Sequence, residues 1–290
     1  MKLSENIIFI RLTFSLPSQS RKISATAENV QANRISASAR LFTGAAFAAI
    51  KSADTGTRAR LLSLAIPVPS AFRGAYVLPR RLLDRAVNLL ESAKNTRDDL
   101  VINFIADSYD AERERAKAEL GAAFDSRDFP EPGVLQTRFD MGWSLFQIDV
   151  PQDLPAGVRE SESAKLREQI NTVAVECREA LRTGLLDMIN RLAESLKPGE
   201  DGKVKRLHET AVENLREFLD TLADRDITSD DQIRAIGEQA KAIIGTTKAD
   251  DLRDSKSTAE KVRARLAEVG AELGALVSVS GQRKFDLDLE

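Results

Sequence analysis

The sequence predicts a mainly α-helical protein, with long antiparallel helices forming an extended coiled-coil-like bundle. Three observations predict this fold class. Apolar residues recur at three- and four-residue spacing over most of the chain after Pro79. Residues 1–79 carry ten basic and three acidic residues, so they have a net charge of +7 within a total of −3. After Phe129, prolines and glycines interrupt the helical pattern, which is lost up to Pro155. We therefore expect a small basic α/β head over residues 1–79 and an elongated helical bundle over residues 80–290.

The head begins with a predicted strand. The run Ile7–Phe14 is rich in β-branched and aromatic residues and stops at Pro17. Ser36 precedes apolar residues that recur at helical spacing up to Ile50, which predicts a helix. After residue 66, two prolines and Gly74 break regular structure.

A long helix is predicted next. Pro79 suits a first helical position, because its missing amide hydrogen has no role there. Helically spaced apolar residues follow from Leu82 to Tyr109, and charges of alternating sign extend the pattern to about Phe124. A helix of about 42 residues would be about 60 Å long, which suggests a stalk or an extended bundle.

The helical spacing is lost between Phe129 and Pro155. Pro130, Pro132 and Gly133 break the chain, and apolar and aromatic residues then gather near residues 134–150. We expect a β-hairpin here, inserted between the two longest helices.

Four more helices are predicted after the hairpin. The second long helix runs from about Ser161 to Leu196, and its near-heptad apolar stripe favours a coiled-coil seam with the first. Three shorter helices follow over residues 204–222, 230–243 and 257–276, the second of them capped by Ser229 or Asp230. The alternation in residues 281–290 fits a final edge strand or an acidic tail.

Several kinds of site lack their residues in this sequence. One Cys and one His exclude a disulfide framework and a zinc site of Cys and His ligands. The sequence contains neither a phosphate-binding G-x-x-x-x-G-K-[ST] loop nor a G-x-S-x-G elbow. Paired acids such as Asp230 and Asp231 are better explained as helix caps than as metal ligands. Cys177 lies on an apolar stripe and is expected to be a core residue, and His208 a surface one. We predict no catalytic residue, metal ligand or cofactor, and an enzyme would need scattered carboxylates that only the fold could assemble.

The remaining candidate residues favour the binding of a partner. The head contributes basic side chains, which would bind nucleic acid in a salt-dependent way or dock on an acidic protein, including a second copy. Trp143 and Phe146, in the expected hairpin, are either buried anchors or contacts at a partner surface. The predicted partner-binding residues are Arg21, Lys22, Arg34, Arg40, Trp143 and Phe146.

The sequence does not favour a membrane protein. The apolar run at residues 7–10 is too short for a secretory signal, and the stretches 41–50 and 61–72 fall well below the about 20 apolar residues that span a bilayer. We therefore expect a cytoplasmic protein without a stable membrane anchor.

Several segments together suggest a family. They are RKIS at residues 21–24, LAIPVPSAFRGAYVLP at 64–79, VINFIADSYD at 101–110, DFPEP at 128–132 and FQIDVP at 146–151. Over roughly residues 5–155 the chain resembles an uncharacterised protein family of tailed phages and integrative conjugative elements. Genes of that family lie near genes for a MoxR-type AAA ATPase and a von Willebrand A domain protein. The resemblance implies a non-enzymatic partner of an ATPase module, and it brings no catalytic residues with it.

These observations lead to one main expectation about function and two alternatives. The leading prediction is a non-enzymatic interaction or scaffold protein of a phage or mobile element, forming homo-oligomers and acting with an AAA ATPase module. The first alternative is a nucleic-acid-binding accessory protein in phage replication or recombination. The second is a membrane-active helical protein whose hairpin inserts into lipid.

Overall fold

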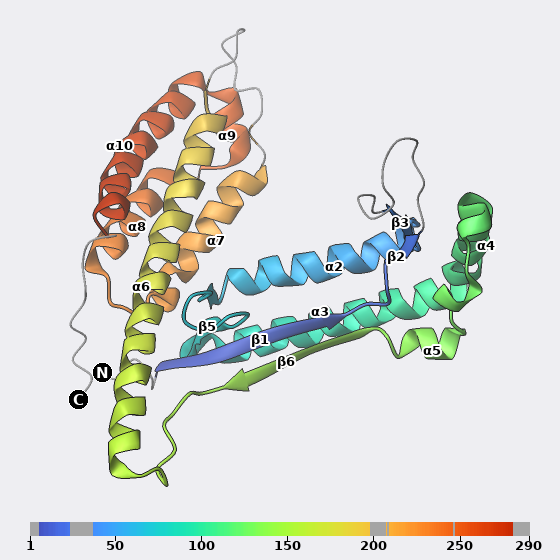
Figure 1. The fold of residues 1–290 in the computed structure, drawn as a ribbon. Coiled ribbons are helices and arrows are strands. Elements are labelled where there is room, and N and C mark those ends of the chain that lie inside the picture. Colours follow the sequence, from blue (N-terminus) through green and yellow to red (C-terminus); the bar gives the residue numbers. More distant parts are fainter. Residues whose placement is uncertain (1–5, 24–36, 198–206, 208, 246, 281–290) are drawn as a thin grey trace, which may run out of the picture. The chain divides into compact units, whose positions relative to one another are not determined.

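The computed structural model describes residues 6–23, 37–197, 207, 209–245 and 247–280 (Figure 1). The protein is mainly helical and has a small antiparallel sheet, as the sequence predicts. It divides into two compact units, which we describe separately. Unit 1 comprises Met1–Arg11, Leu62–Asp84 and Leu145–Glu290, and unit 2 comprises Leu12–Leu61 and Arg85–Ser144. The expected boundary after Pro79 falls inside unit 1.

The main sheet has the strand order β4-β5-β1-β6. Its strands are β1 (Ile7–Ser15), β4 (Ile66–Pro67), β5 (Tyr76–Pro79) and β6 (Asp140–Phe146). β1 confirms the predicted N-terminal strand, and its residues Ile7 to Ile10 are all buried. β1 pairs antiparallel with β5, and Ile7 lies opposite Pro79. This register places the start of β1 beside the residues that follow β5.

Unit 1 contains a bundle of helices around one core. They are α6 (Ala156–Ser195), α7 (Glu209–Arg225), α8 (Asp231–Ile244), α9 (Ala249–Asp254) and α10 (Lys256–Ser280), shown from yellow to red in Figure 1. The apolar stripe of α6 is buried against these helices, with Leu181, Leu185 and Ile189 each at most 2% exposed. Ile66, Val77 and other residues of the β4–β5 region belong to the same core. The four helices predicted after residue 155 are therefore present, with α9 as a short addition.

Buried charges fix the loop between α7 and α8. Arg182 of α6 donates from Nε to Asp230 at 2.7 Å, and both residues are 7% exposed. Asp230 is also the N-cap of α8, where it accepts from the amide of Ile233, which confirms one of the two caps considered from the sequence. Burial opposes ionisation of Asp230, but the hydrogen bond and the charge of Arg182 outweigh it and lower the pKa of this carboxyl.

Unit 2 combines a helical pair with a small β-ribbon. Its elements include β2 (Ser20–Ile23), β3 (Ala37–Arg40), α2 (Ala45–Leu62), α3 (Leu83–Asn103), α4 (Tyr109–Leu120) and α5 (Pro132–Gln136). The helix expected before Ile50 starts later than the sequence suggests, since β3 occupies residues 37–40. The chain from Arg80 to Ala123 is helical almost throughout, but a π-helical turn at Phe104–Ser108 separates α3 from α4, which then points in a new direction (Figure 1).

An aromatic cluster forms one core of unit 2. Phe104 lies between the rings of Phe42, Phe47, Phe139 and Tyr109, with centroids 5.6 to 6.1 Å apart in edge-on geometry. These rings come from segments far apart in the sequence, so they hold the π-helical turn against the start of α2.

Tyr109 yields a prediction about alkaline pH. Its hydroxyl donates to the carbonyl of Pro130 at 2.7 Å, and burial raises its pKa from 10.0 to about 12. Because the folded-state pKa is raised, the stabilisation is complete below pH 10 and is lost as the pH rises toward 12. An ultraviolet titration of phenolate absorbance should show a late step that is missing in Tyr109→Phe. A titration of the variant that still shows the late step would contradict this assignment.

The carboxylate of Glu112 caps the start of α2 from outside the helix. It is 4% exposed and accepts from the backbone amides of Thr43 and Gly44, the latter at 2.8 Å, while Arg115 neutralises it at 2.8 Å. A Cβ on Gly44 would collide with Oε2 of Glu112. This contact explains why a residue without a side chain precedes α2.

Gly44→Ala is therefore expected to destabilise the protein by about 1–3 kcal/mol, because the carboxylate must move away from the amides that it caps. Gly56→Ala is the matched control within α2, because a Cβ there meets nothing within 4 Å. It should stabilise the helix by about 0.5–1 kcal/mol. Chemical denaturation measures both, and equal effects of the two substitutions would refute the capping role.

Two expectations about the bundle are corrected by the structure. The hairpin expected at residues 134–150 does not form: α5 occupies Pro132–Gln136, and the single strand β6 lies next to β1. Nor do the two longest predicted helices share one seam. The α6 stripe belongs to the core of unit 1, whereas Val101, Phe104 and Tyr109 belong to the aromatic core of unit 2. The final strand or tail expected at residues 281–290 lies outside the described residues.

Candidate functional site

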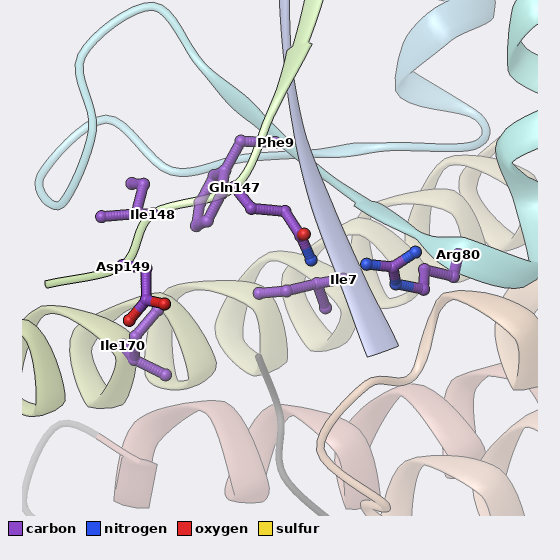
Figure 2. Close-up of a pocket in the computed structure, with 7 residues that line it drawn as sticks. All are labelled: Ile7, Phe9, Arg80, Gln147, Ile148, Asp149 and Ile170. Atoms are coloured by element: carbon purple, nitrogen blue, oxygen red, sulfur yellow. The ribbon is translucent and has the colours of Figure 1, made fainter. Parts of the chain in front are cut away.

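A pocket of about 380 Å³ lies in unit 1 (Figure 2). Four segments of the chain line it: the start of β1, the residue after β5, the residues after β6, and α6. The lining residues are Ile7, Phe9, Arg80, Gln147, Ile148, Asp149 and Ile170. This volume falls within the range of ligand-binding clefts.

Sheet pairing explains how these segments meet. Ile7 lies opposite Pro79, so Arg80 follows directly beside the start of β1. Phe146, the last residue of β6, stacks on Phe9 with ring centroids 5.6 Å apart, and this places Gln147 and the next residues over the same end of the sheet.

The floor of the pocket is apolar and rigid. Ile7, Phe9 and Ile170 are 2%, 3% and 6% exposed and all belong to the core of unit 1. A second ring, Phe72, meets Phe9 edge-on at 4.9 Å. Side chains held in a packed core cannot easily move to fill the pocket, so a ligand would find the floor already formed.

The rim is polar and exposed, and it carries both signs of charge. Figure 2 shows Arg80 and Gln147 extending toward one another, with Arg80 and Asp149 at opposite ends of the labelled group. Oδ1 of Asp149 accepts from the backbone amide of Val150 at 2.8 Å. The rim can therefore hydrogen-bond to an anion at one end and to a donor at the other.

Arg80 and its neighbour Arg81 have different roles. Arg81 donates to the backbone carbonyls of Ala223 and Asp224 at 2.5 and 2.8 Å, and so binds the C-terminal end of α7, where a cation is favoured. The backbone carbonyl of Arg80 accepts from the amide of Leu83, but its guanidinium makes no hydrogen bond or ion pair with any residue that the structure describes. Its guanidinium is thus available to a ligand, and Arg81 anchors the turn that carries it.

The chain matches no protein-family model, no curated protein and no solved structure. The resemblance to the phage and conjugative-element family therefore stays a prediction.

The predicted partner-binding residues are found in different places. Arg21 is engaged internally: it pairs with Asp128 at 2.6 Å and donates to the carbonyl of Ala123. Lys22 and Arg40 are exposed on the ribbon of β2 and β3, and Arg34 lies outside the described residues. Trp143 is half-buried in β6.

Phe146 is the predicted residue that lies closest to the pocket. It borders the pocket through its stacking on Phe9, and the guanidinium of Arg11 lies 5.6 Å from its ring centroid. Arg80, Asp149 and Ile170 were not singled out from the sequence. The sequence gives one signal near two of them. Arg80 directly follows Pro79, and Asp149 lies two residues before Pro151, so a turn is expected at each place.

The other residues considered from the sequence have structural roles in this fold. Cys177 is fully buried, and burial raises the pKa of its thiol, so it behaves as the predicted core residue. Asp251 accepts from the amide of Lys248 at 2.8 Å at the start of α9, which is the predicted capping role. Within the described part of the chain, no three His, Cys, Asp or Glu side chains gather as a metal site requires. In the same residues, every helix is too short or too polar to cross a bilayer.

Proposed function

We propose that this protein is a non-enzymatic interaction or scaffold protein, and that it captures a partner protein at the pocket of unit 1. The observation that carries the proposal is Arg80, a guanidinium without a carboxylate partner in the described chain, beside a preformed apolar floor. In protein interfaces, arginine and aromatic side chains in desolvated pockets usually contribute most of the binding free energy.

The proposed partner follows from the resemblance. A MoxR-type AAA ATPase and a von Willebrand A domain protein are the first candidates, in the setting of a phage or mobile element. Such a scaffold would act as a homo-oligomer, because a ring-forming ATPase presents several equivalent docking sites.

Sedimentation velocity of the purified chain with each candidate tests the proposal. We expect a complex with at least one of them, and Arg80→Glu should weaken it at least tenfold, since it replaces an attraction by a repulsion. Arg73→Ala is the matched control, because it removes an exposed Arg of unit 1 that does not line the pocket. No complex with either candidate, or equal binding by wild type and Arg80→Glu, would refute the proposal.

One observation favours a second function, binding of nucleic acid by unit 2. In the β2–β3 ribbon, Ser20 lies opposite Arg40 and Lys22 lies opposite Ser38. All four are exposed, so the two cations lie diagonally on one polar face. A two-stranded ribbon with a basic face can enter the major groove of DNA.

Binding of a fluorescent DNA duplex at increasing salt separates this function from the first. If the ribbon binds DNA, its affinity should fall steeply as the salt concentration rises. The double variant with Lys22→Ala and Arg40→Ala should show a shallower slope of log affinity against log salt concentration, by the equivalent of about two phosphate contacts. The absence of binding at low salt would exclude the second function and leave the first untouched.

A further inference from the structure

The two charges on the pocket rim give the chemistry of the segment that fits it. We infer that the pocket binds an extended peptide of a partner protein in which an apolar side chain lies between a cationic residue and an acidic one. This inference rests on the proposed function and specifies the partner segment that the same pocket recognises.

The acidic residue is recognised at the end of the pocket that contains Arg80. A guanidinium presents planar, permanently charged donors that match a carboxylate. The carboxamide of Gln147 extends toward the same place and adds a neutral donor (Figure 2). Arg80 has no competing carboxylate among the described residues, so binding an acidic side chain breaks no internal ion pair.

The cationic residue is recognised at Asp149. Its side chain is exposed, and only Oδ1 accepts a hydrogen bond, from the amide of Val150. Oδ2 remains as an acceptor, at the end of the pocket opposite Arg80 (Figure 2). A peptide with two acidic residues would therefore be repelled at this end, and one with two cationic residues would be repelled at Arg80.

The apolar residue is recognised between the two charges. Ile7, Phe9 and Ile170 line the floor of the pocket and are nearly closed to solvent, with the half-buried Ile148 beside them. A Phe or Leu side chain placed here removes its own apolar surface from water, because the floor is already nearly closed to solvent. The charges then fix the direction of the peptide, and burial of its apolar side chain adds to the affinity.

Fluorescence polarisation with four labelled peptides tests the inference on the full chain. The probes are GSKFDSG, its two same-charge versions GSDFDSG and GSKFKSG, and the apolar deletion GSKADSG. We expect GSKFDSG to bind at least fivefold more tightly than each of the other three. A charge swap provides the sharper test: Arg80→Glu should reverse the preference, so that GSKFKSG binds more tightly than GSKFDSG. The expected reversal includes tighter binding of GSKFKSG by the variant than by wild type, a gain of affinity that a misfolded protein cannot show.

Four peptides that bind alike, or an Arg80→Glu variant with unchanged preference, would overturn the inference. If the complex with the ATPase depends on Arg80 but the four peptides bind alike, this inference is wrong and the proposed function stands. Lys284, Phe285 and Asp286 of this chain have the same order and lie outside the described residues. The series is therefore repeated on a chain that ends at Ser280. Tighter peptide binding by that chain would support the recognised chemistry and identify residues 281–290 as a competitor, and unchanged binding would support an external partner.

Discussion

Leu181→Asp is expected to abolish cooperative folding of the helical bundle in unit 1. Leu181 is 2% exposed and lies in the middle of the α6 stripe, within the core shared with α7, α8 and α10. The substitution removes a buried apolar side chain, which alone costs about 2–5 kcal/mol, and it places a carboxylate in the apolar core. The sum approaches the total stability of an ordinary domain, about 5–15 kcal/mol.

Val158→Asp is the matched control on the same helix. Val158 is 48% exposed, so the same change there should alter stability by no more than about 0.5 kcal/mol. Circular dichroism during thermal unfolding measures both variants. A melting curve of Leu181→Asp that coincides with the wild-type curve would show that the α6 stripe is not part of a packed core. Leu215→Asp, in α7, should act in the same way, because Leu215 is fully buried in that core.

Local sequence patterns predicted the elements that depend on local physics. The β1 strand follows from β-branched and aromatic residues, and α6 follows from its regular apolar spacing. Of the two caps predicted for α8, Ser229 and Asp230, the structure has Asp230, and Cys177 is buried as predicted, because a cap and a stripe position are properties of a few neighbouring residues.

Pairing between distant segments could not be predicted in this way. An apolar stripe shows which face of a helix is buried but not what buries it, so the α6 stripe was assigned to the wrong partner. The residues of β6 have strand character, yet their partner is β1, and the hydroxyl of Thr13 donates to the carbonyl of Gly142 across 129 positions. Pro132 at the first turn of α5 started a helix where the first strand of a hairpin was expected.

The pocket cannot be predicted from the sequence for the same reason. Arg80, Asp149 and Ile170 belong to three segments, and no spacing in the sequence relates them. The basic residues of the head are close in sequence and so predict a binding surface, but in the structure Arg21 pairs with Asp128. Whether a charged side chain is available for binding depends on its partners in the fold, and these become visible only once the fold is known.

Asp54→Ala is the second substitution with a large expected effect, because it removes the counterion of a buried arginine in unit 2. Arg97 is 1% exposed, and its Nε donates to Oδ1 of Asp54 at 2.6 Å. Its Nη2 donates to the carbonyl of Ser15 at 2.9 Å, while Nη1 is buried without a hydrogen-bond partner. A guanidinium already short of partners cannot tolerate the loss of its carboxylate. Breaking a buried ion pair in this way typically costs about 3–5 kcal/mol.

A double substitution separates the value of the pair from the cost of an orphaned charge. Arg97→Met with Asp54→Leu removes both charges and keeps apolar volume at both positions, so it should be far less destabilising than Asp54→Ala alone, and about neutral if packing is retained. Urea denaturation of both single variants and the double variant gives the coupling energy. Additive effects would contradict the interpretation, because they would mean that Arg97 does not depend on Asp54. A strong coupling would instead show that Arg97 is tolerated in its buried position only with the carboxylate of Asp54 beside it.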